Sequence, residues 1–103
     1  MEHYKFNFDS NCSDKKKKPY TVVGVVASGN LEVLVEENSI QKDKTTFDIK
    51  TSAGGYEETW KAVVNDIADE YETGGLNFNI NDSGAVPAIV SLRLRQAIEE
   101  IYS

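Results

Sequence analysis

Residues 46–81 read TFDIKTSAGGYEETWKAVVNDIADEYETGGLNFNIN, and this stretch decides the fold. Apolar and polar residues alternate at both of its ends, which predicts one strand over residues 46–51 and another over residues 76–81. Between them, apolar residues recur every three or four positions, which predicts a helix with one buried stripe. The stripe consists of Tyr56, Trp60, Val63, Ile67 and Tyr71. Large aromatic side chains at this spacing are typical of a core, and we expect Tyr56 and Trp60 to lie there.

Two segments of contrasting composition begin the chain. Residues 4–8 alternate aromatic and polar side chains, which predicts a first strand with one buried face. Residues 9–19 are polar and contain the four consecutive lysines Lys15 to Lys18, so we expect an exposed loop. The lysine run is a candidate docking patch for an acidic partner, although such runs are usually only solvated.

A hairpin follows the lysine-rich loop. Residues 20–27 read YTVVGVVA, and a β-branched run that is apolar on both faces favours a central strand. Residues 31–36 alternate again and form the partner strand. Ser28, Gly29 and Asn30 separate the two strands, which predicts a tight turn with Ser28 at its tip, because Gly and Asn tolerate positive φ angles.

The C-terminal residues predict a second amphipathic helix. Pro87 suits the first turn of a helix, and Val90, Leu94, Ala97 and Ile101 form one apolar stripe after it. Asp82 lies in the turn before this helix, where we expect it to cap or buttress the turn.

The predicted order of elements is ββββαβα, in a single domain over residues 1–103. The strand, helix and strand of residues 46–81 imply a right-handed crossover, whereas the hairpin at Ser28 implies an antiparallel pair. We therefore expect a mixed, mostly antiparallel sheet of about five strands. Two helices with single apolar stripes would cover one face, which gives a two-layer α+β sandwich.

Composition and charge exclude several classes of function. The 103 residues carry a net charge of -6, which disfavours binding to a nucleic acid backbone. The longest apolar stretch, residues 20–27, is far shorter than the roughly 20 residues that span a bilayer. Cys12 is the only cysteine, so no internal disulfide can form, and a reducing compartment is favoured. We expect a soluble, cytoplasmic protein that binds neither nucleic acid nor membrane.

Catalytic motifs are missing around the candidate residues. Val26 and Asn30 occupy the positions where a hydrolase nucleophile motif would place glycines around Ser28, and the only histidine is His3. None of the seven glycines is followed by lysine, which excludes a phosphate-binding P-loop. Scattered carboxylates do not predict a metal site. A non-catalytic role is therefore expected.

Ser28 remains as a candidate site of a different kind. At an exposed hairpin tip beside a glycine, its hydroxyl would be accessible to a modifying enzyme. Ser, Gly and Asn also satisfy ordinary turn chemistry, so the residues alone leave a purely structural role open.

Three stretches resemble the acyl carrier (δ) subunit of malonate decarboxylase. They are VVASGNLEVLVE at residues 25–36, the helix containing Trp60, and NINDSGAVPAIVSLRLRQAIEEI at residues 79–101. The resemblance covers most of the chain from about residue 20 onward. Its most specific parts are the Ser-Gly-Asn-Leu-Glu-Val segment at residues 28–33 and the Asp-x-Gly-Ala-x-Pro segment at residues 82–87, before the last helix.

The resemblance implies a carrier function. In this family the serine of the Ser-Gly motif bears 2'-(5''-phosphoribosyl)-3'-dephospho-CoA through a phosphodiester, and Ser28 is the matching position, flanked by Gly29 and Asn30. The group would carry acetyl and malonyl as thioesters. The implied partners are the transferase and decarboxylase subunits of malonate decarboxylase and the transferase that attaches the group. Arg93 and Arg95 are candidate contacts for a partner or for the phosphates of the group.

Other functions remain open at this point. The acyl carrier (γ) subunit of citrate lyase carries the same group, but the proline in Gly84 to Pro87 favours the malonate decarboxylase subunit. The family commonly has Asp where this chain has Asn30, so a carboxylate is missing beside the attachment site. A small acidic interaction module without a prosthetic group is a further alternative. A stand-alone hydrolase is the poorest, because the chain has a single histidine.

Overall fold

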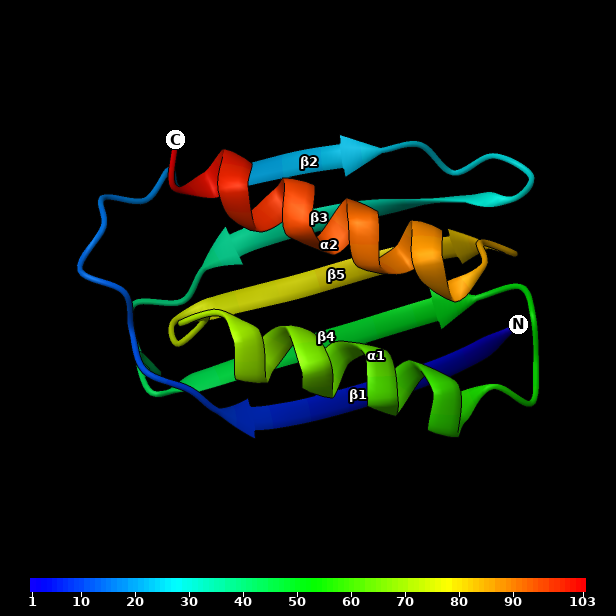
Figure 1. The fold of residues 1–103 in the computed structure, drawn as a ribbon, viewed down its shortest axis with the longest axis horizontal. Helices are drawn as coiled ribbons and strands as arrows, with labels where there is room; N and C mark the ends of the chain where they lie inside the picture. Colours follow the sequence, from blue (N-terminus) through cyan, green and yellow to red (C-terminus); the bar gives the residue numbers. More distant parts are fainter.

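A computed structural model describes residues 1–103 as one five-stranded sheet with two helices (Figure 1). The elements follow the predicted order ββββαβα. They are β1 (Glu2–Asp9), β2 (Tyr20–Gly24), β3 (Asn30–Glu37), β4 (Lys44–Thr51), α1 (Glu57–Glu70), β5 (Leu76–Ser83) and α2 (Pro87–Ile101).

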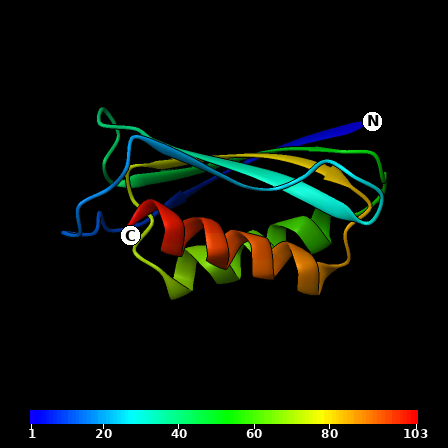
Figure 2. The same cartoon turned by 90° about the horizontal axis from the view of Figure 1, so that it is seen from above.

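The strands lie in the order β1-β4-β5-β3-β2. Only β4 and β5, the strands joined through α1, are parallel, and the other three pairs are antiparallel. Both helices lie on the same face of the sheet, as the view from above shows (Figure 2). The predicted two-layer α+β sandwich with a mixed, mostly antiparallel sheet is therefore confirmed.

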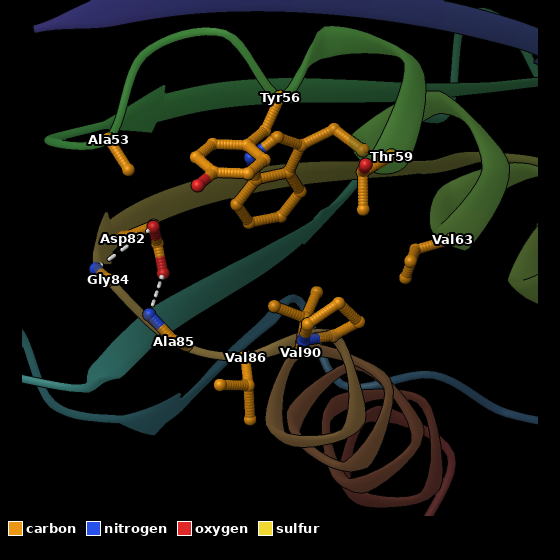
Figure 3. Close-up of a pocket in the computed structure, with 11 residues that line it drawn as sticks. Ala53, Tyr56, Thr59, Val63, Asp82, Gly84, Ala85, Val86 and Val90 are labelled. Carbon is orange, nitrogen blue, oxygen red and sulfur yellow. Dashed lines mark hydrogen bonds between the residues drawn. The ribbon is translucent and has the colours of Figure 1, made fainter.

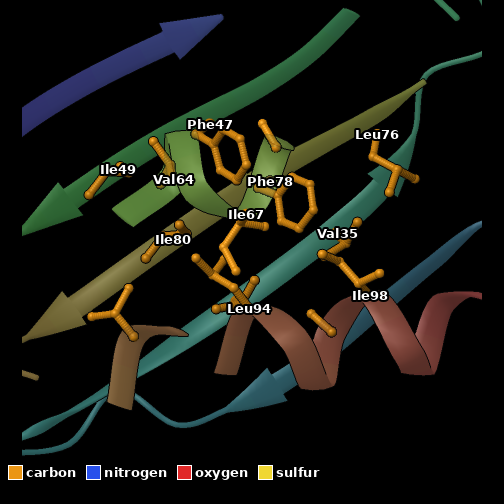
Figure 4. Close-up of a cluster of buried hydrophobic side chains, with 14 of the residues drawn as sticks. Val35, Phe47, Ile49, Val64, Ile67, Leu76, Phe78, Ile80, Leu94 and Ile98 are labelled. Carbon is orange, nitrogen blue, oxygen red and sulfur yellow. The ribbon is translucent and has the colours of Figure 1, made fainter. Parts of the chain in front are cut away.

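The core fills the space between this face and the helices (Figure 4). The rings of Phe47 in β4 and Phe78 in β5 stack with centroids 4.6 Å apart, and both are fully buried. The stripe predicted for the last helix is confirmed, because Val90, Leu94, Ala97 and Ile101 are all buried. Alternation in β5 is confirmed as well, with Leu76, Phe78 and Ile80 buried and the intervening asparagines on the open face.

The prediction that residues 20–27 form a central strand is wrong. β2 ends at Gly24 and lies at the edge of the sheet, while β5 occupies the centre. Thr21 and Val23 face the helices, but Val22 is 49% exposed and pairs with the half-buried Leu34 on the open face. The strand has apolar residues on both faces because Val22 lies beside Leu34 on the open face of the sheet. Residues 25–27, the end of the apolar run, belong to the loop that follows β2.

The stripe of α1 also differs from the prediction. Trp60 and Ile67 are buried as expected, whereas Tyr56 precedes the helix and is 55% exposed. Val64, rather than Val63, completes the buried face. Tyr56 is the residue before the helix and its backbone is not helical (φ -114°, ψ 23°), so the helical spacing does not fix the direction of its side chain.

The lysine-rich segment is less exposed than expected. The backbone of Cys12 pairs with Thr73 and Gly74, and the side chain of Lys17 is only 9% exposed. Lys17 Nζ lies 3.3 Å from Cys12 Sγ and 3.7 Å from Glu37 Oε2. Lys18 pairs with Glu100 of α2 at 2.7 Å. Two of the four lysines therefore bind this segment to the protein itself.

Candidate functional site

The loop between β2 and β3 presents Ser28 at its tip. The loop covers residues 25–29 and is longer than the three-residue turn that the sequence predicts. The amide of Asn30 donates to the carbonyl of Ala27 at 2.8 Å, which closes a four-residue turn. Gly29 has φ +75° at the third position, a geometry that favours glycine and places Ser28 second in a type II turn.

Hydrogen bonds attach this turn to the rest of the protein. The amide of Gly29 donates to the carbonyl of Ser83, at the end of β5, at 2.7 Å. At the other side of the loop, the amide of Val25 donates to the carbonyl of Leu31 at 3.1 Å. The tip is thus connected both to its own hairpin and to the central strand.

Asn30 is held by two donors. Its Oδ1 atom accepts from the amide of Leu31 at 2.8 Å and from Nε of Arg93, in α2, at 3.3 Å. Arg93 also donates through Nη1 to Gln96 at 2.9 Å. Aspartate, which is common in the family at this position, and asparagine both have an Oδ1 acceptor. Either residue can therefore accept the bonds from Leu31 and Arg93. Asn30 is half-buried and connects the start of β3 to α2, whereas Ser28 and Gly29 before it are exposed.

Ser28 itself is exposed, and the only histidine is distant from it. His3 lies in β1, three strands away from β3, which corresponds to about 14 Å across the sheet. The His3 side chain is paired with Asp48 instead. The structure does not bring these two residues together, and this arrangement does not support a hydrolase built on Ser28.

A pocket opens at the same end of the molecule (Figure 3). It has a volume of about 380 Å³ and lies between the beginning of α1 and the beginning of α2. Sequence reasoning missed it, since two segments distant in the sequence, residues 53–63 and 82–90, form it. The lining consists of Ala53, Tyr56, Thr59, Trp60 and Val63, of Asp82, and of Gly84, Ala85, Val86, Pro87 and Val90.

Asp82 supports the turn between β5 and α2, as expected. Its carboxylate accepts hydrogen bonds from Thr51 Oγ1 at 2.8 Å, from the amide of Gly84 at 3.1 Å and from the amide of Ala85 at 3.0 Å. The residue is 7% exposed. Both oxygens are therefore occupied in fixing the edge of the pocket (Figure 3).

Arg95 lies farther from the loop and is engaged with α1. Its Nη2 atom donates to Glu70 Oε2 at 2.6 Å, and this hydrogen bond raises the pKa of Arg95 above its usual value. Of the two arginines that the sequence singled out, Arg93 is the one that bonds to Asn30, the residue directly after the loop that carries Ser28.

The family model for the malonate decarboxylase delta subunit matches residues 18–101. The chain belongs to the malonate decarboxylase delta subunit family. The match includes the loop, the pocket and both helices. It favours the malonate decarboxylase subunit over its citrate lyase counterpart, as the proline in the segment before α2 predicts.

Similar proteins agree over almost the full chain. The chain is 46% identical over 101 residues to the malonate decarboxylase acyl carrier protein of Bradyrhizobium diazoefficiens, covering 98% of this chain and 95% of that protein. It is 44% identical over 98 residues to the protein of the same name from Acinetobacter calcoaceticus, covering 95% and 94%. It also resembles a chain in the crystal structure of a Pseudomonas malonate decarboxylase hetero-tetramer in complex with malonate. That likeness has a TM-score of 0.86 and 35% identity and covers 98% of this chain and 99% of the other.

Proposed function

We propose that this delta-subunit family member is the acyl carrier subunit of a malonate decarboxylase, with Ser28 as the attachment site of its prosthetic group. The observation that carries the proposal is the exposed Ser28 side chain on a turn bonded to the central strand. Its hydroxyl is accessible, while the backbone beneath it is fixed by the bond from Gly29 to Ser83.

The loop fits a phosphodiester-linked group. A Cβ atom built on Gly29 meets nothing within 4 Å, so the space beside Ser28 is open. Ala27 and Gly29 are small and exposed, which leaves room for a modifying enzyme around the hydroxyl. Ser28 would hold the 2'-(5''-phosphoribosyl)-3'-dephospho-CoA group, and Gly29 and Asn30 would shape its base. When attached, the group supplies a thiol that carries acetyl or malonyl as a thioester.

The chain's own residues present the group and do not transform the substrate. His3, the only histidine, lies in β1, three strands away from β3, so no imidazole is available to the loop as a general base. We assign the chemistry to partners: a transferase subunit, decarboxylase subunits and the enzyme that attaches the group. Exposed Val25 and Val26 in the loop offer them an apolar contact beside Ser28.

The proposal includes a cytoplasmic setting. The single free cysteine, Cys12, favours a reducing compartment. No helix of the structure has the length and apolar character that crossing a membrane requires.

Labelled malonate tests the thioester function. The complex is purified from its native host and incubated with carbon-labelled malonate, and the label bound to this chain is measured before and after hydroxylamine, which cleaves thioesters. We expect label on the wild-type chain that hydroxylamine releases, no label on Ser28→Ala, and normal label on Ser39→Ala, an exposed serine in another loop. Label retained by Ser28→Ala would overturn the assignment of the site, and absence of label from the wild type would favour an interaction module without a prosthetic group.

A further inference from the structure

The pocket between α1 and α2 begins next to the turn that carries Ser28. The amide of Gly29 is bonded to the carbonyl of Ser83, and the following residue, Gly84, lines the pocket. Following the backbone through this bond places the Cα atoms of Ser28 and Gly84 within about 10 Å of each other. In Figure 1 the β2–β3 loop and the first turns of both helices lie at the same end of the molecule.

The pocket has the size and lining of a site for a small uncharged group. Its volume of about 380 Å³ falls within the range of ligand pockets. Seven of the eleven lining residues are hydrophobic, among them Trp60, Val63 and Val90. The hydroxyl groups of Tyr56 and Thr59 and the indole NH of Trp60 are neutral donors on side chains that line the pocket (Figure 3).

The charge of the pocket discriminates between ligands. Asp82 is its only charged residue, and none of the lining residues is basic. Glu57 and Glu58, in the first turn of α1, add negative charge nearby. A second carboxylate brought into this pocket would lose its hydration without gaining a cationic partner.

The rim of the pocket is open to a group that comes from the loop. Tyr56 is 55% exposed and Val86 is 59% exposed, although both are large and apolar. Trp60, deeper in the pocket, is only 6% exposed. The arrangement provides an accessible apolar entrance that leads to a buried aromatic wall.

We propose that this pocket binds the acetyl thioester end of the group carried on Ser28 and does not accept the malonyl thioester. The inference rests on the proposed function and specifies which acyl state the chain retains. An acetyl group and its sulfur are uncharged and can be buried against Trp60 and Val63, whereas malonyl ends in a carboxylate that faces Asp82. The acetyl form is thereby shielded from water between cycles, and the malonyl form stays exposed to the partner subunits.

Trp60 provides a direct readout, because it is the only tryptophan in the chain. The unmodified, acetyl-loaded and malonyl-loaded chains are compared by nuclear magnetic resonance, and intact mass establishes the acyl state of each sample. We expect acetyl loading to shift the indole NH signal of Trp60 and the amide signal of Ala85. We expect malonyl loading to leave both signals at the positions of the unmodified chain.

A matched pair of α1 variants checks that the pocket causes the shift. Val63→Phe fills the pocket, while Ala62→Phe adds the same ring at an exposed neighbouring position outside it. The acetyl-dependent shift should be lost in Val63→Phe and kept in Ala62→Phe, with thermal unfolding used to verify that both fold. If Val63→Phe does not fold, the wild-type comparison of the two acyl states still decides.

Two results would overturn the inference while leaving the carrier function intact. One is a loaded chain in which neither acyl state moves the Trp60 signal, and the other is an equal shift in both states. A chain whose mass shows no group on Ser28 would instead overturn the proposed function. The failures of the two proposals are therefore distinguishable in the same samples.

Discussion

The amide nitrogen of Gly29 lies 2.7 Å from the carbonyl oxygen of Ser83 and donates a hydrogen bond to it. This bond connects the tip of an edge hairpin to the end of β5, the central strand of the sheet. The exposed Ser28 therefore projects from a braced turn. This arrangement suits a carrier, because the modifying enzyme binds a turn of defined shape. After attachment, the prosthetic group moves while the turn stays in place.

Two glycines of the β2–β3 hairpin, Gly24 and Gly29, should respond differently to alanine. Both have positive φ angles, but a Cβ atom at Gly29 meets open space, whereas at Gly24 it would lie 2.1 Å from the carbonyl oxygen of Leu31. We expect Gly29→Ala to cost about 1 kcal/mol of unfolding free energy. Gly24→Ala should cost at least about 3 kcal/mol, because the backbone must shift. Urea unfolding measures both, and equal costs would contradict the observed geometry.

Asn30 should tolerate replacement by aspartate better than by alanine. Its Oδ1 atom accepts from Leu31 and Arg93, and an aspartate retains that atom and adds a charge opposite the guanidinium. We expect Asn30→Asp to change stability by less than about 1 kcal/mol. Asn30→Ala should lose about 0.5–1.5 kcal/mol and accelerate hydrogen exchange at the amides of the loop. Arg93→Ala is the companion variant, and unchanged exchange in both would refute the bracing role.

Removal of the Asp82 carboxylate should lower the free energy of unfolding more than the substitutions at Asn30 do. The carboxylate is nearly buried and accepts hydrogen bonds from Thr51, Gly84 and Ala85. We expect Asp82→Ala to lower the unfolding free energy by about 2–4 kcal/mol, with a smaller loss for Asp82→Asn. Chemical denaturation is the measurement, and a loss within about 0.5 kcal/mol would show that the buried bonds contribute little.

Tyr102 should make stability depend on alkaline pH. Burial, and to a smaller extent the nearby Cys12, Glu72 and Glu37, raise the pKa of Tyr102 to about 12. The neutral phenol is favoured in the folded state, so its contribution is complete below about pH 10 and is lost as the pH rises towards 12. Tyr102→Phe should remove the part of the 295 nm titration that occurs near pH 12. A wild-type titration complete well below that pH would contradict the burial of this side chain.

Alternation and helical periodicity predicted most of the fold. The stripes of β5 and α2 are unambiguous, since each has one buried face, and the crossover through α1 required β4 and β5 to be parallel. The position of β2 was not predictable in this way. A valine-rich sequence predicts a central strand even where, as in β2, the outward-facing valine is covered only by a neighbouring side chain such as Leu34. The order of the strands in the sheet also depends on contacts between residues that are distant in sequence.

The candidate site was predictable in part. The Ser-Gly-Asn turn and its exposure follow from local chemistry, because glycine is required where φ is positive. The bond from Gly29 to Ser83 and the contact between Asn30 and Arg93 join residues more than fifty positions apart, so no local pattern indicates them. The pocket is also formed by distant segments. Tyr56 was assigned to the core by its spacing, although it stands at the entrance of that pocket.

Localising the added mass on the chain tests the central claim most directly. Trypsin does not cleave before Pro19, so digestion of the natively expressed chain should yield one peptide over residues 18–42, which contains Ser28 and Ser39. We predict that this peptide carries the mass of the phosphoribosyl-dephospho-CoA group and that fragmentation places it on Ser28. Ser28→Ala should lose the mass, and Ser39→Ala should keep it. An unmodified peptide from cells growing on malonate, or a mass that fragmentation places on another residue, would contradict the account.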